Sequence, residues 1–235
     1  MPSPRRSVAR SCPVDARDGV VAFLATWLLA AVASSVVLVA AGATDDVAIG
    51  VLAASLLAGW VVYGVGVALT STRLGSGDVR SDFGIRVAPA DLVGIPLGVV
   101  AQIVAVPAVY VPLRARWPET FDDGALVETA EDLVERSPGA LILLLGALVV
   151  VGAPVVEEIV YRGLLQRPLL TSLPAGPAIV LVAVVFAAIH FRPVEFPGLL
   201  VAGLVFGTAA WWTGRLGTSI AAHLAFNATG LAMVI

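Results

Sequence analysis

Residues 19–43 read GVVAFLATWLLAAVASSVVLVAAGA, an apolar run that contains no charged side chain. A transmembrane helix needs about 20 consecutive apolar residues, so this run is long enough to cross a bilayer. It is too long for the apolar part of a signal peptide, which spans about 7–15 residues, although arginines precede it. We therefore expect a first membrane helix that is retained.

The rest of the chain continues this pattern. Its 235 residues are 59% hydrophobic and 13% charged, whereas soluble domains carry about 25% charged residues. The composition predicts an all-α, polytopic transmembrane helical bundle of about seven spans, of which the fifth and sixth are short. The predicted spans are residues 19–43, 47–70, 92–112, 140–169, 178–190, 198–213 and 218–235.

Arginines predict the orientation of these spans. They precede the first span, connect the second to the third, and follow the fourth and the sixth: Arg5, Arg6, Arg10, Arg17, Arg73, Arg80, Arg86, Arg162, Arg167 and Arg215. Positively charged loops favour the cytoplasm, so we expect a multi-pass protein of the cell membrane with a cytoplasmic N-terminus. The first connection carries Asp45 and Asp46 instead. Arginines in the opposite loops weaken the pattern, namely Arg114, Arg116, Arg136 and Arg192.

The loop at residues 113–139 is acidic. Within it, apolar residues recur at helical spacing at Leu126, Val127, Ala130, Leu133 and Val134. This spacing predicts a short amphipathic helix on the outer membrane surface. A solvated acidic loop is an equally weighted alternative.

Few polar side chains that could carry chemistry lie inside the apolar segments, where ionisable groups are costly and indicate function. Glu157 and Glu158 lie in the fourth span and His190 ends the fifth. His223 lies in the seventh, with Asn227 one turn later. At about 1.5 Å per residue, Glu157, His190 and Asn227 lie about 15–20 Å from the predicted cytoplasmic surface. His223 lies about 9 Å deep, so a tilted or deeper seventh helix would bring all four level.

Helical geometry separates the two glutamates. Glu158 and Arg162 are four residues apart, in the order that favours an ion pair, and this pair by itself favours a structural role. Glu157 lies about 100° around the helix and has no such local partner. A buried Glu can take a proton from water. Glu157, His190 and His223 could hold Zn²⁺ or another divalent ion, or His and Asn could donate hydrogen bonds to an oxyanion without a metal. The residues leave both mechanisms open.

Three motifs contain these residues: Glu157-Glu158-Ile-Val-Tyr-Arg162, Phe186-Ala-Ala-Ile-His190 and His223-Leu-Ala-Phe-Asn227. Together and in this order they resemble the CPBP family of intramembrane proteases, which includes CAAX prenyl endopeptidases and bacteriocin-processing or immunity proteins. The resemblance covers roughly residues 140–227. It implies that Glu157 activates the attacking water, that His190, His223 and Asn227 complete the catalytic site, and that Glu158 and Arg162 support it.

The predicted spans and the resemblance together divide the chain into four parts. We expect a cytoplasmic tail at 1–18, three transmembrane helices at 19–112, an extracytoplasmic acidic loop at 113–139 and a four-helix intramembrane protease core at 140–235. The expected partners are a membrane-associated peptide or protein substrate and the lipid bilayer. A net charge of -3 without a basic run argues against nucleic acid.

Two other functions remain open at this level. One is a non-enzymatic scaffold, immunity or peptide-binding protein of the same fold. The other is a proton- or ion-coupled transporter, because buried Glu and His also relay protons. No inverted repeat is visible, which disfavours a transporter.

Three further features receive structural interpretations. Gly203 and Gly207 predict close helix packing, with a homo-oligomer contact as the alternative. Arg192 and Glu195 predict a local ion pair. Trp60 and Tyr63 are interpreted as packing or lipid contacts.

Overall fold

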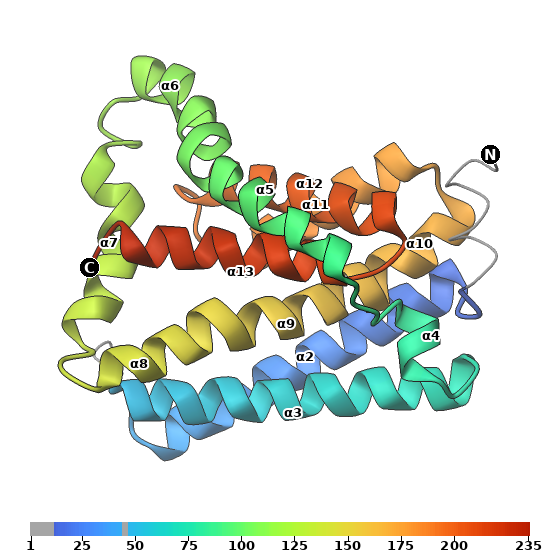
Figure 1. The fold of residues 1–235 in the computed structure, drawn as a ribbon. Coiled ribbons are helices and arrows are strands. Elements are labelled where there is room, and N and C mark those ends of the chain that lie inside the picture. Colours follow the sequence, from blue (N-terminus) through green and yellow to red (C-terminus); the bar gives the residue numbers. More distant parts are fainter. Residues whose placement is uncertain (1–11, 44–46) are drawn as a thin grey trace.

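The computed structural model describes residues 12–43 and 47–235, and within these ranges the chain is helical and contains no strand (Figure 1). Five helical stretches are long and apolar enough to cross a membrane: Ala16–Ala40 (α2), Ile49–Leu74 (α3), Pro89–Arg116, Leu141–Ser172 and Phe196–Thr213 (α12). The all-α membrane bundle is therefore confirmed. α12 reaches span length, whereas α11 (Ala175–Ile189) and α13 (Gly217–Ala232) are shorter, so the count of seven remains a prediction.

Two of the long stretches are composite helices. The first contains the 3-10 turn η1 (Pro89–Val93), α5 (Gly94–Val100), η2 (Ala101–Ala105) and α6 (Val106–Arg116). The second contains α8 (Leu141–Gly146), η3 (Ala147–Gly152), α9 (Ala153–Glu157), η4 (Glu158–Gln166) and α10 (Arg167–Ser172). η2, η3 and η4 are π-helical. Short π-helical segments shift hydrogen-bond partners by one residue and frequently occur at functional sites.

The helices alternate in direction, so the connections gather at two ends of the bundle (Figure 1). The start of α2, the short helix α4 (Val79–Phe83), the α10–α11 turn and the α12–α13 turn share one end. The C-terminus and α7 (Asp123–Glu135) lie at the other. The connections between the helices thus alternate between the two ends, as the sequence predicted. Five charged residues of the predicted pattern lie outside the described residues, namely Arg5, Arg6, Arg10, Asp45 and Asp46. Which end faces the cytoplasm remains a prediction.

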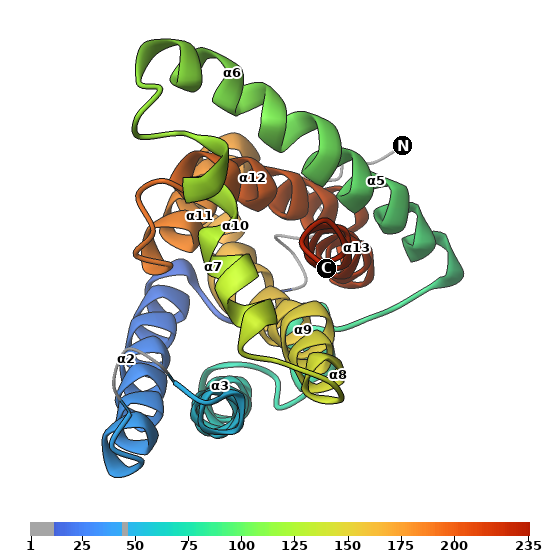
Figure 2. The same cartoon turned by 90° about the vertical axis from the view of Figure 1, so that its left-hand side faces the viewer.

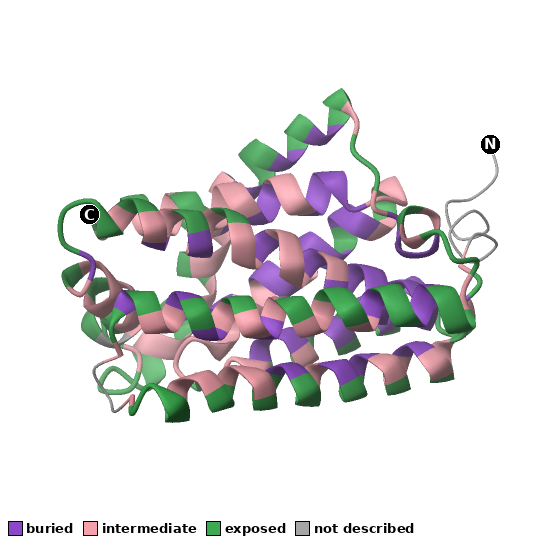
Figure 3. Ribbon diagram, turned by 90° about the horizontal axis from the view of Figure 1, so that it is seen from below, coloured by how far each residue is buried: buried purple, intermediate pink, exposed green. Residues whose placement is uncertain are grey.

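The outer faces of the bundle are apolar. Val21, Leu24, Leu28, Val32 and Val36 of α2 are each more than half exposed. Figure 3 shows buried residues concentrated between the helices and exposed residues along their outer faces. Such an extended apolar surface must be shielded from water, and the lipid of the bilayer shields it.

The main buried cluster joins the first span to the C-terminal half. Phe23 of α2 belongs to one buried cluster with Tyr161 and Leu164 of η4 and with Val182 and Phe186 of α11. The rings of Phe23 and Tyr161 lie 5.6 Å apart, and those of Tyr161 and Phe186 lie 5.2 Å apart. α2 is therefore packed against the helix that carries the first motif, and Tyr161 connects it to the helix that carries the second.

A buried carboxylate positions the helix that carries the third motif. Asp91 of η1 is 4% exposed and accepts hydrogen bonds from Arg215 Nε at 2.8 Å and from Thr218 Oγ1 at 2.6 Å. Glycines let α5 approach α13 closely, because a Cβ added at Gly98 would overlap the carbonyl of Ala222. These contacts hold the third span against α13.

α7 confirms the predicted amphipathic helix and overturns the loop alternative. It lies across one end of the bundle (Figure 2). Thr129 Oγ1 donates to Glu195 Oε1 at 3.0 Å and accepts from Arg192 Nη1 at 2.5 Å. Arg192 and Glu195 form the predicted local pair at 3.9 Å. Residues 113–139 are thus largely helical.

Close packing at Gly203 is also confirmed. A Cβ added there would lie 3.0 Å from the Cα of Ala183, so glycine lets α12 approach α11. Homo-oligomerisation remains an untested alternative.

Candidate functional site

The site is built around a buried ion pair. Arg162 Nη1 lies 2.9 Å from Glu158 Oε1, and both side chains are 0% exposed, so the predicted pair is confirmed. Arg162 also donates to the backbone carbonyl of Gly203 at 3.2 Å. Its guanidinium lies over the rings of Phe186 at 4.7 Å and Phe206 at 5.5 Å, where the aromatic faces stabilise the cation. Glu158 and Arg162 therefore link η4, α11 and α12.

The same carboxylate orients His223. Nδ1 of His223 lies 3.0 Å from Glu158 Oε1, and its ring stacks on Phe206 with centroids 4.4 Å apart. A hydrogen bond to a carboxylate places the proton on Nδ1, which leaves Nε2 of the neutral ring as an acceptor. This Nε2 lies 3.8 Å from Glu157 Oε2. His223 is therefore beside both glutamates, and the predicted difference in depth is absent.

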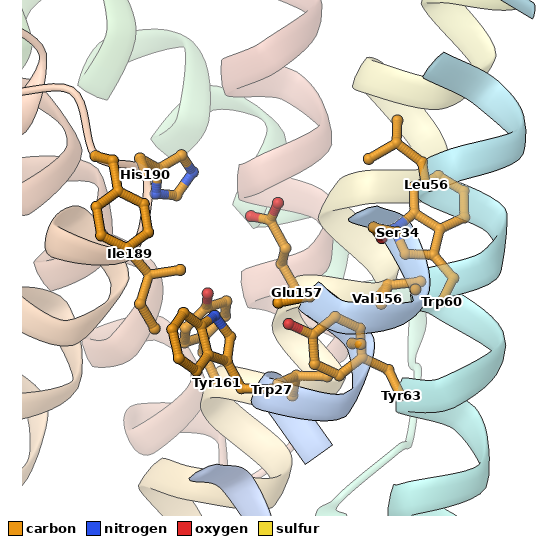
Figure 4. Close-up of a pocket in the computed structure, with 15 residues that line it drawn as sticks. Trp27, Ser34, Leu56, Trp60, Tyr63, Val156, Glu157, Tyr161, Ile189 and His190 are labelled. Carbon is orange, nitrogen blue, oxygen red and sulfur yellow. The ribbon is translucent and has the colours of Figure 1, made fainter. Parts of the chain in front are cut away.

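Glu157 is the accessible carboxylate of the two. Its side chain is 27% exposed, and it faces a cavity of about 300 Å³ that His190 also lines. Figure 4 shows Glu157 and His190 on opposite sides of this cavity, with Trp27, Tyr63 and Tyr161 nearby. The glutamate without a local ion-pair partner is thus the one that a substrate could reach.

His190 lies where α11 ends. Its Nδ1 is 2.6 Å from the carbonyl oxygen of Phe186, which accepts a hydrogen bond and leaves Nε2 of the neutral ring free to accept one. The next residue, Phe191, has φ +53, a left-handed conformation that bulky residues rarely adopt. The chain therefore turns immediately after His190. His190 lines a second cavity of about 330 Å³ in addition to the first.

Asn227 lies in that second cavity. Its Nδ2 donates to the backbone carbonyl of Val149 at 2.8 Å, within the π-helical η3. The four predicted residues therefore do not surround one space. Glu157 and His190 share one cavity, His190 and Asn227 share the other, and His223 is buried beside Glu157 without lining either.

The predicted metal ligands were tested against this geometry. His190 and His223 each present Nε2 opposite a fixed Nδ1 hydrogen bond, which is the arrangement common among metal-binding histidines. However, within residues 12–43 and 47–235, no three His, Cys, Asp or Glu side chains gather as a group that could hold a metal ion. Glu157, His190 and His223 thus do not fit a metal in this arrangement, and no step below depends on one.

Several residues of the site were missed from the sequence. Trp60 and Tyr63, which were interpreted as packing or lipid contacts, also line the cavity that Glu157 faces. Trp27 and Tyr161 line the same cavity, and Phe206 stacks on His223. An aromatic residue in an apolar span has no sequence signal that distinguishes a cavity wall from a lipid contact. The cavity is therefore lined by residues of the first two spans and of the C-terminal half.

The fold and the site define a helical membrane protein with an accessible glutamate and two histidines between its helices. Residues 139–229 match the family model described as Type II CAAX prenyl endopeptidase Rce1-like, and this similarity is consistent with a CPBP family intramembrane protease. The match confirms the resemblance that the three motifs carry. Comparisons with curated proteins and with solved structures found no match.

Proposed function

We propose that this protein is an intramembrane endopeptidase that hydrolyses a peptide bond of a membrane-associated substrate, with Glu157 as the general base. One observation carries the proposal. Glu157 faces a cavity opposite His190 and lies 3.8 Å from His223, whereas the adjacent Glu158 is fully buried and held by Arg162. The family match supports a protease, and it makes a prenylated CAAX peptide the first substrate to test.

The reaction consumes one water molecule, and Glu157 ends it in the protonation state in which it began. Glu157 takes a proton from water in the cavity while the water oxygen attacks the peptide carbonyl carbon, forming a tetrahedral oxyanion. Glu157 then gives that proton to the departing amide nitrogen, the C–N bond breaks, and an amine and a carboxylic acid form. The proton of the acid passes to the amine, so the products leave as a carboxylate and an ammonium ion. His190 orients the water through Nε2, or donates to the oxyanion when its ring is protonated. Glu158 and Arg162 are positioning residues, because they hold His223 and do not line the cavity.

Glu157→Gln tests this assignment. The amide keeps the size of the side chain and removes the base, so cleavage of a membrane-anchored peptide should fall by about 10²-fold or more. Glu119→Gln removes a carboxylate from an exposed loop and is the matched control, with unchanged cleavage expected. Both variants are compared with wild type at equal folded concentration in the same detergent.

The outcome also separates the alternative functions. Cleavage that persists in Glu157→Gln would refute the base. A wild-type protein that cleaves nothing, in cells whose phenotype Glu157→Gln leaves intact, would favour a scaffold or immunity protein. Loss of proton-coupled uptake without any cleaved product would favour a transporter.

A further inference from the structure

One polar side chain of the third span takes no part in the network described above. Gln102 lies in the π-helical η2, and its Oε1 is buried without a hydrogen-bond partner. Its neighbours Ile103 and Val104 are apolar and about half exposed. A buried acceptor that has lost water and gained no donor lowers stability. Such an atom in a native structure calls for a functional explanation.

The position of Gln102 suggests that explanation. It lines the cavity of about 330 Å³ that contains His190 and Asn227, and also an adjacent cavity of about 670 Å³. A Cβ added at Gly230 would lie 3.3 Å from Gln102 Nε2, so the amide packs on α13 one turn beyond Asn227. The rest of the smaller cavity is largely apolar, with Leu133, Leu145 and Phe226 among its lining residues.

We propose that the cavity on the Asn227 side of His190 is a substrate subsite, in which Gln102 Oε1 accepts a hydrogen bond from a backbone N–H of the bound peptide. This inference rests on the proposed function. A peptide whose scissile bond lies between Glu157 and His190 can continue past His190 into this cavity. Inside a membrane protein, each peptide N–H that loses water needs an acceptor. Gln102 offers one, and the apolar walls accommodate the peptide side chains.

Binding is measured in a Glu157→Gln background, so that turnover does not intervene. The probe is a fluorescent, farnesylated peptide ending in a CAAX sequence, in bicelles. Gln102→Met keeps the length of the side chain and removes the acceptor, so Kd should rise about three- to tenfold. Gln102→Glu retains an acceptor and should stay within about twofold of the parent. Ile103→Met, which alters the exposed neighbouring position, is the control and should leave Kd unchanged.

Stability distinguishes binding from a purely structural role. Gln102→Met removes an unpartnered polar atom, so its melting temperature should be equal to or higher than that of the parent. A lower melting temperature together with an unchanged Kd would overturn the inference.

An ester scan of the peptide identifies the donor. Each backbone N–H near the scissile bond is replaced in turn by an ester oxygen. One ester replacement should raise the Kd of the peptide for the parent protein. The same replacement should leave the Kd for the Gln102→Met variant unchanged. If the loss of affinity from every ester replacement adds to the loss caused by Gln102→Met, the subsite is overturned. A parent protein that binds no such peptide would overturn it too. Peptide that binds through Gln102 but is not cleaved by wild type would retain the subsite and refute the endopeptidase.

Discussion

At the scale of single residues, Arg162 connects all three motifs. It binds Glu158 of the first motif, lies over Phe186 of the second, and through Glu158 shares a partner with His223 of the third. Removing one member of a buried ion pair leaves a charge without water or a counter-ion. Removing one partner of this pair is therefore expected to destabilise the site more than removing a partner of a surface ion pair does.

Arg162→Leu tests this role. We expect unfolding in mild detergent to become easier by about 3–5 kcal/mol, with less folded protein recovered. Arg192→Leu is the matched control, because its partner Glu195 lies 3.9 Å away and the arginine side chain is 53% exposed, and about 1 kcal/mol or less should be lost. Equal melting temperatures for Arg162→Leu and wild type would remove the structural role.

Metal dependence is a further prediction at this scale. Since Glu157, His190 and His223 do not form a ligand group in the described residues, we expect cleavage to survive treatment with a chelator. Metal analysis of the purified protein provides an independent readout. Near-stoichiometric zinc that is lost in both His190→Ala and His223→Ala would instead establish the ligand set suggested by the sequence.

At the scale of elements, glycines determine how closely α5 and α13 approach. Gly98→Ala would place a Cβ on the carbonyl of Ala222, and such overpacking lowers stability by about 1–3 kcal/mol. Gly64→Ala in α3 is the control, because no atom lies within 4 Å of the added Cβ. Alanine is preferred over glycine in a helix by about 0.5–1 kcal/mol, so this variant should be as stable as wild type or more stable. Thermal unfolding of both proteins measures the difference, and equal effects would contradict the close contact.

Secondary structure was largely predictable at this scale, but its irregularities were not. The apolar runs predicted the positions of the long helices to within a few residues, because each run reflects contact with lipid or with other helices. The π-helical segments had no such signal, since they depend on which partner takes the backbone carbonyls. Val149, for example, accepts from Asn227, a residue far along the chain.

At the scale of the whole molecule, the two ends of the bundle predict opposite membrane sides. Gly77 lies between α3 and α4, and Gly124 lies in α7, at opposite ends of the bundle (Figure 1). The arginine distribution places the first in the cytoplasm and the second outside. Reporter fusions at these two positions should therefore give opposite signals. Same-side signals would contradict both the orientation and the proposed number of spans.

The sequence by itself determined the class of the molecule and the residues of the candidate site. Long uncharged runs have few stable environments other than lipid, and costly polar groups within those runs mark the site. The four-residue spacing was enough to identify the Glu158–Arg162 pair, because an α-helical turn is a local property. It also left Glu157 as the glutamate without a local partner.

Only the tertiary structure decided how these groups share space. It placed His223 beside both glutamates, divided the site into two cavities that meet at His190, and brought Trp60 and Tyr63 of α3 to the cavity wall. These relations depend on the crossing of helices that are far apart in the chain, which no local periodicity encodes. Gln102 became a candidate for the same reason, since its missing hydrogen-bond partner is visible only once its neighbours are in place.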